Sequence, residues 1–171
     1  MADTGFKTTG AVVSTGGWSN LTTARINTSD NSYAIGAGSA YDVGVLSTYD
    51  FGIPAGATID GIEIQAEFRT ETTGWTANLR FSLSGDGGLT WTPTQLQTNN
   101  KASDATKVYG GPSDTWGKAW TADELSDDNF RIKIEGYVPS SQNQDCMVDL
   151  VIVKVYYTEA GGQTLCCAYI V

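Results

Sequence analysis

The chain has 171 residues, no histidine and a formal net charge of −9 from 19 acidic and 10 basic side chains. Phosphate backbones repel such a chain, so we expect no direct binding to nucleic acid. The longest apolar runs, 150–153 and 165–171, are far too short to span a bilayer, and the N-terminus lacks the basic start and apolar core of a signal peptide. We therefore expect a protein made in the cytoplasm, without membrane contact.

Three regions differ in composition along the chain. Residues 1–32 are polar and rich in Gly, Thr and Ser, which indicates an N-terminal arm or loop region. Residues 33–158 hold alternating apolar and polar positions, which indicates the folded domain. Gly161 and Gly162 form a hinge before an apolar segment, so residues 159–171 are predicted to be a C-terminal tail that can form a strand.

The segment 58–69 alternates without interruption. Ile62 and Ile64 point to one face, whereas Glu63 and Gln65 point to the other. Side chains of a strand alternate between two faces, so this segment predicts a strand with one dry and one wet face. Weaker or similar patterns predict further strands at 11–13, 33–36, 43–51, 79–84, within 92–105, at 108–109, at 130–138 and at 146–157.

The predicted fold class is all-β, a two-layer antiparallel β-sandwich. Eight to ten short strands separated by turn residues favour this architecture. A jelly roll is the first topology and a plainer Greek-key sandwich is the alternative. One short helix is expected near 121–127, because Thr121 and Glu124 have the spacing of a capping box.

One turn has a specific pattern. It resembles the Asp-box of sialidases and of several unrelated β-proteins, in which the motif is a hairpin device. The resemblance implies that Asp86 accepts hydrogen bonds from turn amides, that Gly88 has a positive φ, and that the indole of Trp91 covers the turn. It implies no sialidase activity, because the motif is structural. The matching residues are Ser84, Asp86, Gly88, Thr90 and Trp91.

No cofactor is predicted. The odd number of cysteines indicates reduced thiols at Cys146, Cys166 and Cys167, and the absence of histidine argues against zinc. Calcium is the remaining candidate, because loop oxygens of the kind that it prefers are plentiful. Their spacing fits no EF-hand, so capping of turns is the preferred interpretation for Asp30, Asn31, Asp42, Asp86, Asp104, Asp127 and Asp128.

An enzyme is not expected. Without histidine the chain lacks the commonest general base and metal ligand. Two carboxylate pairs, Asp123–Glu124 and Asp127–Asp128, bracket the predicted helix, where acidic residues usually serve as caps or solvate the surface. The sequence offers no means of choosing a catalytic pair.

Exposed tryptophans are the feature that would suit a sugar-binding sandwich. The chain has five, and Trp75 lies in a polar turn where exposure is expected. Trp75 and Trp116 are the candidate sugar-binding residues. In the alternative interpretation Trp91 and Trp116 brace turns and Trp120 caps the core, as tryptophans are usually mostly buried.

Four segments in order, FGIPAGATIDGIEI, YGGPSDTWGKAWTADEL, NFRIKIEG and VDLVIVKVYYT, resemble small virion proteins of tailed phages and prophages with a jelly-roll-like sandwich. The resemblance spans about residues 50–158. It implies a structural protein made in the bacterial host cytoplasm and placed on the outer surface of the head as a decoration (cement) protein. The alternative is a carbohydrate-binding or host-adhesion module of a tail or fibre.

A decoration protein needs contacts with the major capsid protein and with copies of itself, a trimer being one arrangement. The predicted contact segments are the arm 1–17 and the apolar tail, since several weak contacts add through effective concentration. In the tail, the predicted partner-binding residues are Leu165, Cys166, Tyr169, Ile170 and Val171.

Overall fold

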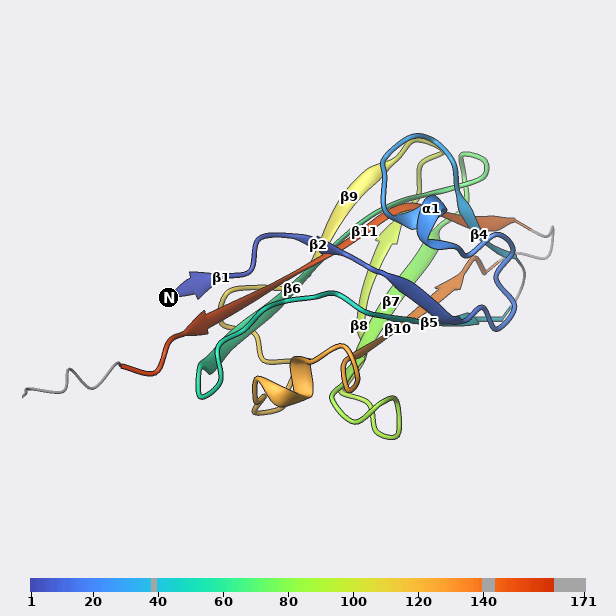
Figure 1. The fold of residues 1–171 in the computed structure, drawn as a ribbon. Helices are drawn as coiled ribbons and strands as arrows, with labels where there is room; N and C mark the ends of the chain where they lie inside the picture. Colours follow the sequence, from blue (N-terminus) through green and yellow to red (C-terminus); the bar gives the residue numbers. More distant parts are fainter. Residues whose placement is uncertain (38–39, 140–143, 162–171) are drawn as a thin grey trace, which may run out of the picture.

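The computed structural model describes residues 1–37, 40–139 and 144–161. Two antiparallel sheets face each other, so the predicted β-sandwich is confirmed (Figure 1). Sheet A has the order β1-β11-β6-β9, with β2 and β4 also paired to β11, and sheet B has the order β3-β5-β10-β7-β8. No helix in the described ranges is long and apolar enough to cross a bilayer.

The strands of sheet A are β1 (Ala2–Asp3), β2 (Lys7–Thr8), β4 (Ala34–Ala37), β6 (Thr58–Thr70), β9 (Ala105–Gly110) and β11 (Asp145–Thr158). Those of sheet B are β3 (Ala11–Ser14), β5 (Asp42–Ser47), β7 (Ala77–Ser84), β8 (Gln95–Asn99) and β10 (Arg131–Tyr137). The described helices are α1 (Thr23–Ile26) and the 3-10 helix η1 (Asp123–Leu125).

The strand order is that of a jelly roll. From β4 to β11 the chain alternates between the two sheets, except at the hairpin that joins β7 to β8 within sheet B. This alternation places β4-β11-β6-β9 in one layer and β5-β10-β7-β8 in the other, which is the double Greek key of a jelly roll.

The core lies between the sheets and consists of the residues that alternation predicts to face inward. On β6, Ile62 and Ile64 are fully buried, and Phe81 on β7 is fully buried as well. Ile132 and Ile134 on β10 complete the opposing layer with no exposed surface. The dry faces predicted for these strands are therefore confirmed.

Residues 1–32 are not a free arm, which corrects the sequence-based prediction. The strands β1 and β2 pair with β11, and β3 pairs with β5. Trp18 is 5% exposed, and its indole N–H donates to the carbonyl of Asp42 at 2.8 Å. Leu21 and Ile26 also enter the core, which makes this region part of the domain. Strands of two residues are too short to show a period, so the sequence could not reveal them.

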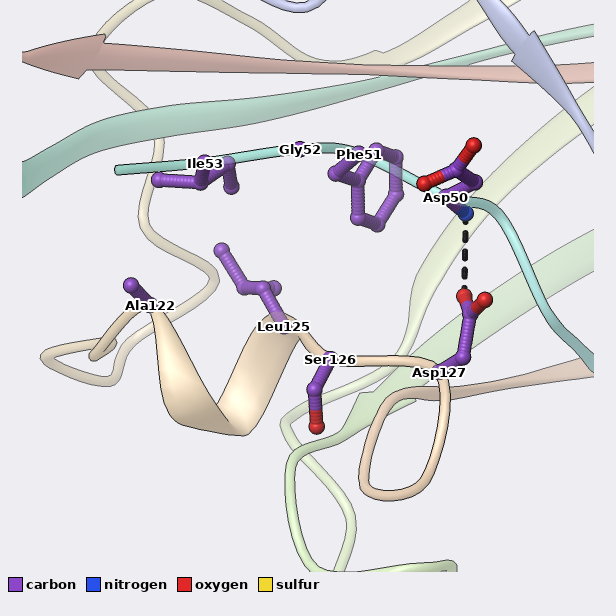
Figure 2. A pocket seen from close by; sticks show the side chains of 8 residues that line it. All are labelled: Asp50, Phe51, Gly52, Ile53, Ala122, Leu125, Ser126 and Asp127. Atoms are coloured by element: carbon purple, nitrogen blue, oxygen red, sulfur yellow. Dashed lines mark hydrogen bonds between the residues drawn. The ribbon is translucent and has the colours of Figure 1, made fainter. Parts of the chain in front are cut away.

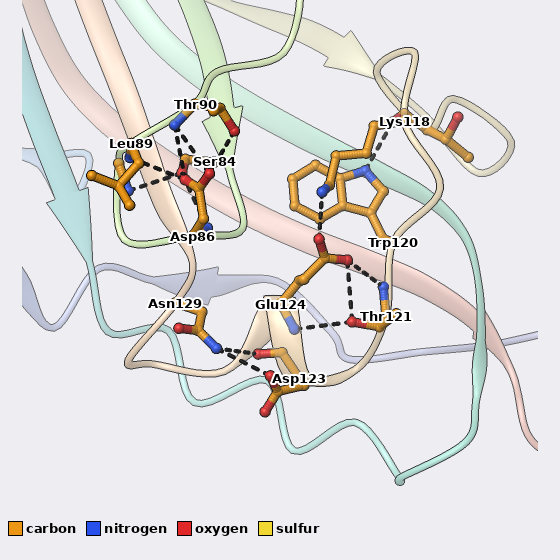
Figure 3. Close-up of polar contacts among 12 residues, drawn as sticks. Ser84, Asp86, Leu89, Thr90, Lys118, Trp120, Thr121, Asp123, Glu124 and Asn129 are labelled. Carbon is orange, nitrogen blue, oxygen red and sulfur yellow. Dashed lines mark hydrogen bonds and ion pairs between the residues drawn. The ribbon is translucent and has the colours of Figure 1, made fainter.

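The strand predicted at 43–51 is shorter in the structure and ends at Ser47. Thr48 and Asp50 have φ angles of 63° and 46°, in the left-handed region, which breaks the extended conformation. The helix η1 lies where it was predicted, with the backbone N–H of Thr121 donating to the Glu124 carboxylate at 2.9 Å and the backbone N–H of Glu124 donating to the Thr121 hydroxyl at 3.3 Å (Figure 3).

The thiol of Cys146 faces the core from β11 and has no exposed surface. Burial raises the pKa of Cys146 to about 12, so this thiol stays protonated and unreactive at neutral pH. Cys166 and Cys167 lie outside the described residues.

The packing of the two sheets predicts that an alanine substitution at an inward position lowers the free energy of unfolding far more than one at an outward position. Replacing the buried Ile134 by alanine leaves a cavity and should lower the free energy of unfolding by about 2–5 kcal/mol. Leu96→Ala is the matched control, because Leu96 on β8 is 49% exposed, and it should change stability by about 0.5 kcal/mol or less. Chemical denaturation of both variants measures the difference, and equal losses would contradict this arrangement of layers.

Candidate functional site

The outer face of sheet B carries the most distinctive group of polar and aromatic side chains. Alternate residues of β7 and β10 point away from the core, and the register pairs them across the strands. Arg80 lies opposite Glu135, and Tyr137 lies opposite Asn78. Lys133 lies two positions from Glu135 on the same face, so the register assembles a polar group around Glu135.

At the centre of this face is a two-point ion pair. Arg80 donates from Nε to Glu135 Oε2 at 3.1 Å and from Nη2 to Glu135 Oε1 at 3.0 Å. The Lys133 Nζ atom lies 3.9 Å from Glu135 Oε2. The guanidinium also lies over the ring of Tyr41, at 3.5 Å from the ring centroid. The Arg80 side chain is therefore held in one orientation by a carboxylate and an aromatic ring.

Aromatic rings flank the ion pair along the strands. The rings of Tyr41 and Tyr137 lie at one side with centroids 5.0 Å apart. On the other side, Lys133 Nζ lies 5.1 Å from the centroid of the Trp91 ring. All three rings are half-buried. Tyr137 and Lys133 are four positions apart on β10, or roughly 13 Å at about 3.3 Å per residue, so the face offers an extended row of rings and charges.

A small cleft continues this row beyond Trp91. It has a volume of about 170 Å³ and lies between the hairpin turn after β7 and the loop that precedes η1. Trp91 and Pro93 contribute apolar surface and Lys118 contributes a cation. The Lys118 ammonium is paired with the Glu124 carboxylate (Figure 3).

The hairpin turn that carries Trp91 is organised by Asp86, as Figure 3 shows. Its carboxylate accepts the backbone N–H groups of Leu89 at 3.0 Å and Thr90 at 2.9 Å, and the hydroxyl of Ser84 at 2.7 Å. Gly88 has a φ of 98°, which only glycine adopts without strain. The turn thus fixes the position of Trp91 at the edge of the row.

Trp116 does not offer a surface for a sugar, which corrects the second of the two tryptophan candidates. It is 2% exposed, and its indole N–H donates to the carbonyl of Ile62 at 2.9 Å. Trp75 is half-buried in the turn between β6 and β7 and packs against the core. It lies at the end of β7 where Asn78 pairs with Tyr137.

Sequence reasoning did not single out Tyr41, Arg80, Glu135 or Tyr137 as a site. The alternation along 79–84 and 130–138 does predict that two side chains of opposite charge, Arg80 and Glu135, both face outward. The missing information was the register between strands that are about 55 residues apart. Tyr41 lies immediately before β5, outside any strand, where no period indicates a direction.

The outer face of sheet A differs in its chemistry. There the carboxylate of Glu63 accepts hydrogen bonds from the Tyr156 hydroxyl at 2.6 Å and from the Gln65 amide at 2.8 Å. Lys154 Nζ lies 4.2 Å from the ring centroid of Phe6. The N-terminal strands β1 and β2 pair with β11 and extend this sheet at its β11 edge (Figure 1).

The predicted carboxylate pairs serve the loops. In the cleft of about 230 Å³ shown in Figure 2, Asp127 lies across from the segment that follows β5. Its Oδ1 accepts the backbone N–H groups of Tyr49 at 2.7 Å and Asp50 at 2.9 Å. Asp127 thereby holds the left-handed turn that ends β5. The neighbouring Glu124 is engaged by the capping box and Lys118.

Loop carboxylates considered for calcium also accept hydrogen bonds within the protein. Asp30 accepts the backbone N–H of Ser32 at 2.9 Å, and Asp104 accepts the hydroxyl of Tyr33 at 2.8 Å. Within the described ranges, no three acidic, cysteine or histidine side chains are placed to share a metal ion. The predicted tail contacts at Leu165, Cys166, Tyr169, Ile170 and Val171 lie outside the described residues.

No family model and no curated protein match the chain. The solved structures that are similar to it include the following three. One is TmCBM61 in complex with beta-1,4-galactotriose, at 12% identity and a TM-score of 0.37, over 77% of this chain and 75% of that one. Another is PfGH50B, at 9% identity and a TM-score of 0.44, over 79% of this chain and 22% of that one.

The third is a two-module structure from Clostridium thermocellum, CBM22-1–GH10 of endo-1,4-beta-D-xylanase 10B complexed with xylohexaose. The identity is 13% and the TM-score 0.43, over 91% of this chain and 28% of that one. The chain thus spans about a quarter of the length of the latter two proteins. At these identities and TM-scores the similarities concern the fold and assign no ligand to this chain.

The geometry of the Asp86 turn predicts an acid-sensitive contribution to stability. Hydrogen bonds from Ser84 and Thr90 lower the pKa of Asp86 below its ordinary value. A lowered native pKa stabilises the fold above the unfolded pKa of about 4, and this contribution is lost as pH falls toward the native pKa. Asp86→Asn should therefore be less stable than the wild type at neutral pH, and the gap should narrow as the pH falls.

Urea denaturation of both proteins from about pH 6 to about pH 2 measures this gap. Asp60→Asn is the control, because Asp60 accepts only the Thr158 hydroxyl among the described residues. A gap between wild type and Asp86→Asn that is constant with pH would contradict the role assigned to the carboxylate.

Proposed function

We propose that this protein is a non-catalytic carbohydrate-binding module and that its ligand binds the outer face of sheet B. One observation supports the proposal most directly. The Arg80 guanidinium pairs with Glu135 and packs on the Tyr41 ring, which contacts Tyr137, while Trp91 contacts the neighbouring Lys133. A row of half-exposed rings with a few fixed polar groups suits a ligand that has both apolar faces and hydroxyl groups.

The physical basis is the amphipathic nature of sugars. The C–H faces of a pyranose ring pack against aromatic side chains, while its hydroxyl groups need hydrogen-bond partners. Arg80 supplies donors, and the side-chain carbonyl of Asn78 supplies an acceptor beside Tyr137, while its amide nitrogen donates to the backbone carbonyls of Thr76 and Tyr137. Because Glu135 and Tyr41 already hold the guanidinium, binding a ligand costs little side-chain entropy there.

A binding role accounts for the carboxylates better than an enzymatic one. Asp86, Asp127 and Glu124 each accept hydrogen bonds that fix a turn or a helix start. A glycosidase needs two carboxylic groups facing each other across the scissile bond. The Glu135 carboxylate is bound by Arg80 on both oxygens, so it positions the guanidinium rather than acting as a base.

The place of such a module on a phage particle stays a prediction from the sequence resemblance. A host-adhesion module of a tail or fibre would use the sugar-binding face directly. A head decoration protein that contacts the major capsid protein and its own copies was expected to use two terminal segments. The N-terminal segment is engaged within its own domain through β1, β2 and β3, which leaves fewer free contacts for that role.

The row of aromatic rings predicts which substitutions weaken glycan binding. Tyr41→Ala and Tyr137→Ala should each lower the affinity for a glycan at least tenfold, or about 1.4 kcal/mol, because each removes a ring from the row. Phe6→Ala is the matched control, since Phe6 is a 36% exposed aromatic residue in the connection between β1 and β2, at the edge of the opposite sheet. A glycan array identifies the ligand, and calorimetry with that glycan gives the affinities.

The proposal would be contradicted if the folded protein bound none of the glycans on the array. It would also be contradicted if Phe6→Ala weakened binding as much as the two tyrosine substitutions. Near-ultraviolet circular dichroism of all three variants separates loss of a binding ring from loss of the fold.

A host-adhesion module and a head decoration protein differ in whether the C-terminal tail is needed for binding. Deleting residues 162–171 should leave glycan affinity unchanged, because the three rings lie just before β5, in the hairpin turn after β7 and on β10. The same deletion should abolish binding to purified capsids if the tail is the adhesive segment of a decoration protein. Calorimetry with the glycan and co-sedimentation with capsids measure the two properties on one variant.

A further inference from the structure

The outer face of sheet B is cationic although the protein as a whole is acidic. The outward charged side chains of β7 and β10 are three cations, Arg80, Arg131 and Lys133, and one carboxylate, Glu135. The Arg80 and Lys133 side chains are 31% and 24% exposed, whereas that of Glu135 is 7% exposed. A ligand on this face therefore meets positive charge first.

The carboxylate of Glu135 does not balance the cations around it. Arg80 and Lys133 share this single carboxylate, at 3.0 Å from Nη2 and 3.9 Å from Nζ. One positive charge is thus left without a matching acid on the face. Arg131, at the end of β10, donates to the backbone carbonyls of Asp127 and Asp128 and is turned toward that loop.

The guanidinium of Arg80 has one edge occupied and one edge open. Nε and Nη2 donate to Glu135, and no residue in the described part of the chain accepts a hydrogen bond from Nη1. The second N–H of Nη2 and the N–H groups of Nη1 form a planar fork on the edge away from Glu135. Such a fork matches the two oxygens of a carboxylate.

We infer that the ligand is an acidic glycan, and that a uronic acid carboxylate binds the open edge of Arg80. This inference rests on the proposed function and specifies its substrate class. The ring of the acidic sugar lies next to Tyr137, which is adjacent to the ion pair on β10. The bound carboxylate supplies the negative charge that the shared Glu135 cannot supply to both cations.

The net charge of −9 does not prevent this binding. At physiological salt, repulsion between charges is screened beyond about 8 Å. A short acidic oligosaccharide on this face therefore responds mainly to Arg80 and Lys133. A long polyanion would extend beyond this face and be repelled by the acidic side chains around it. Oligosaccharides are therefore the suitable probes.

The experiment uses matched pairs of trisaccharides that differ only in the oxidation state of C6. Galacturonic, glucuronic and mannuronic acid trisaccharides are compared with their galactose, glucose and mannose counterparts by calorimetry at constant ionic strength. At least one acidic member should bind at least tenfold more tightly than its neutral counterpart. Equal or tighter binding of every neutral member would overturn the inference and leave the proposed function standing.

If the full-length protein binds neither acidic nor neutral glycans, in these pairs or on the array, the proposed function itself falls. The two failures are therefore distinguishable. Binding of the acidic sugar alone supports both.

Two substitutions test the residues that carry the inference. Arg80→Lys keeps a cation beside Glu135 but removes the planar fork, and it should weaken binding of the acidic trisaccharide at least tenfold. Lys133→Gln should weaken it as well, whereas Lys154→Gln, an identical charge change on sheet A, should not. Unchanged affinity in Arg80→Lys, with a melting temperature like that of the wild type, would overturn the assignment of Arg80.

Discussion

The antiparallel pairing of β6 with β11 is the interaction on which the rest of the structure depends. These are the two longest of the described strands, 13 and 14 residues, and they pair along nearly their whole length. Every other strand of sheet A attaches to one of them: β9 to β6, and β1, β2 and β4 to successive parts of β11. The ladder therefore provides the base on which sheet B closes the core.

The packing of sheet B against this ladder determines which side chains lie on the outer face of sheet B. Its inward residues, such as Phe81 and Ile134, fill the core, and this fixes which residues of β7 and β10 can point outward. The register then sets Arg80 against Glu135, an outcome that depends on packing of the opposite face. Core packing and the candidate binding row are thus two consequences of one strand register.

The turns complete the surface by fixing side chains that the strands do not carry. Asp86 holds the hairpin that positions Trp91, and Asp127 holds the turn that ends β5. In both cases a carboxylate satisfies backbone N–H groups, which is the common use of aspartate in turns. These two loop carboxylates therefore serve the architecture, whereas Glu135 pairs with a cation on the outer face of sheet B.

By itself, the sequence determined the architecture, because the alternation of apolar and polar side chains is a local property with a period of two. The dry face of Ile62 and Ile64, the capping box of Thr121 and the Asp86 turn could all be predicted over short spans. Only the tertiary structure decided that β1 and β2 dock on β11, that Trp116 points inward, and that Arg80 meets Glu135 beside Tyr41. These features depend on contacts between segments far apart in the chain, which no local pattern encodes.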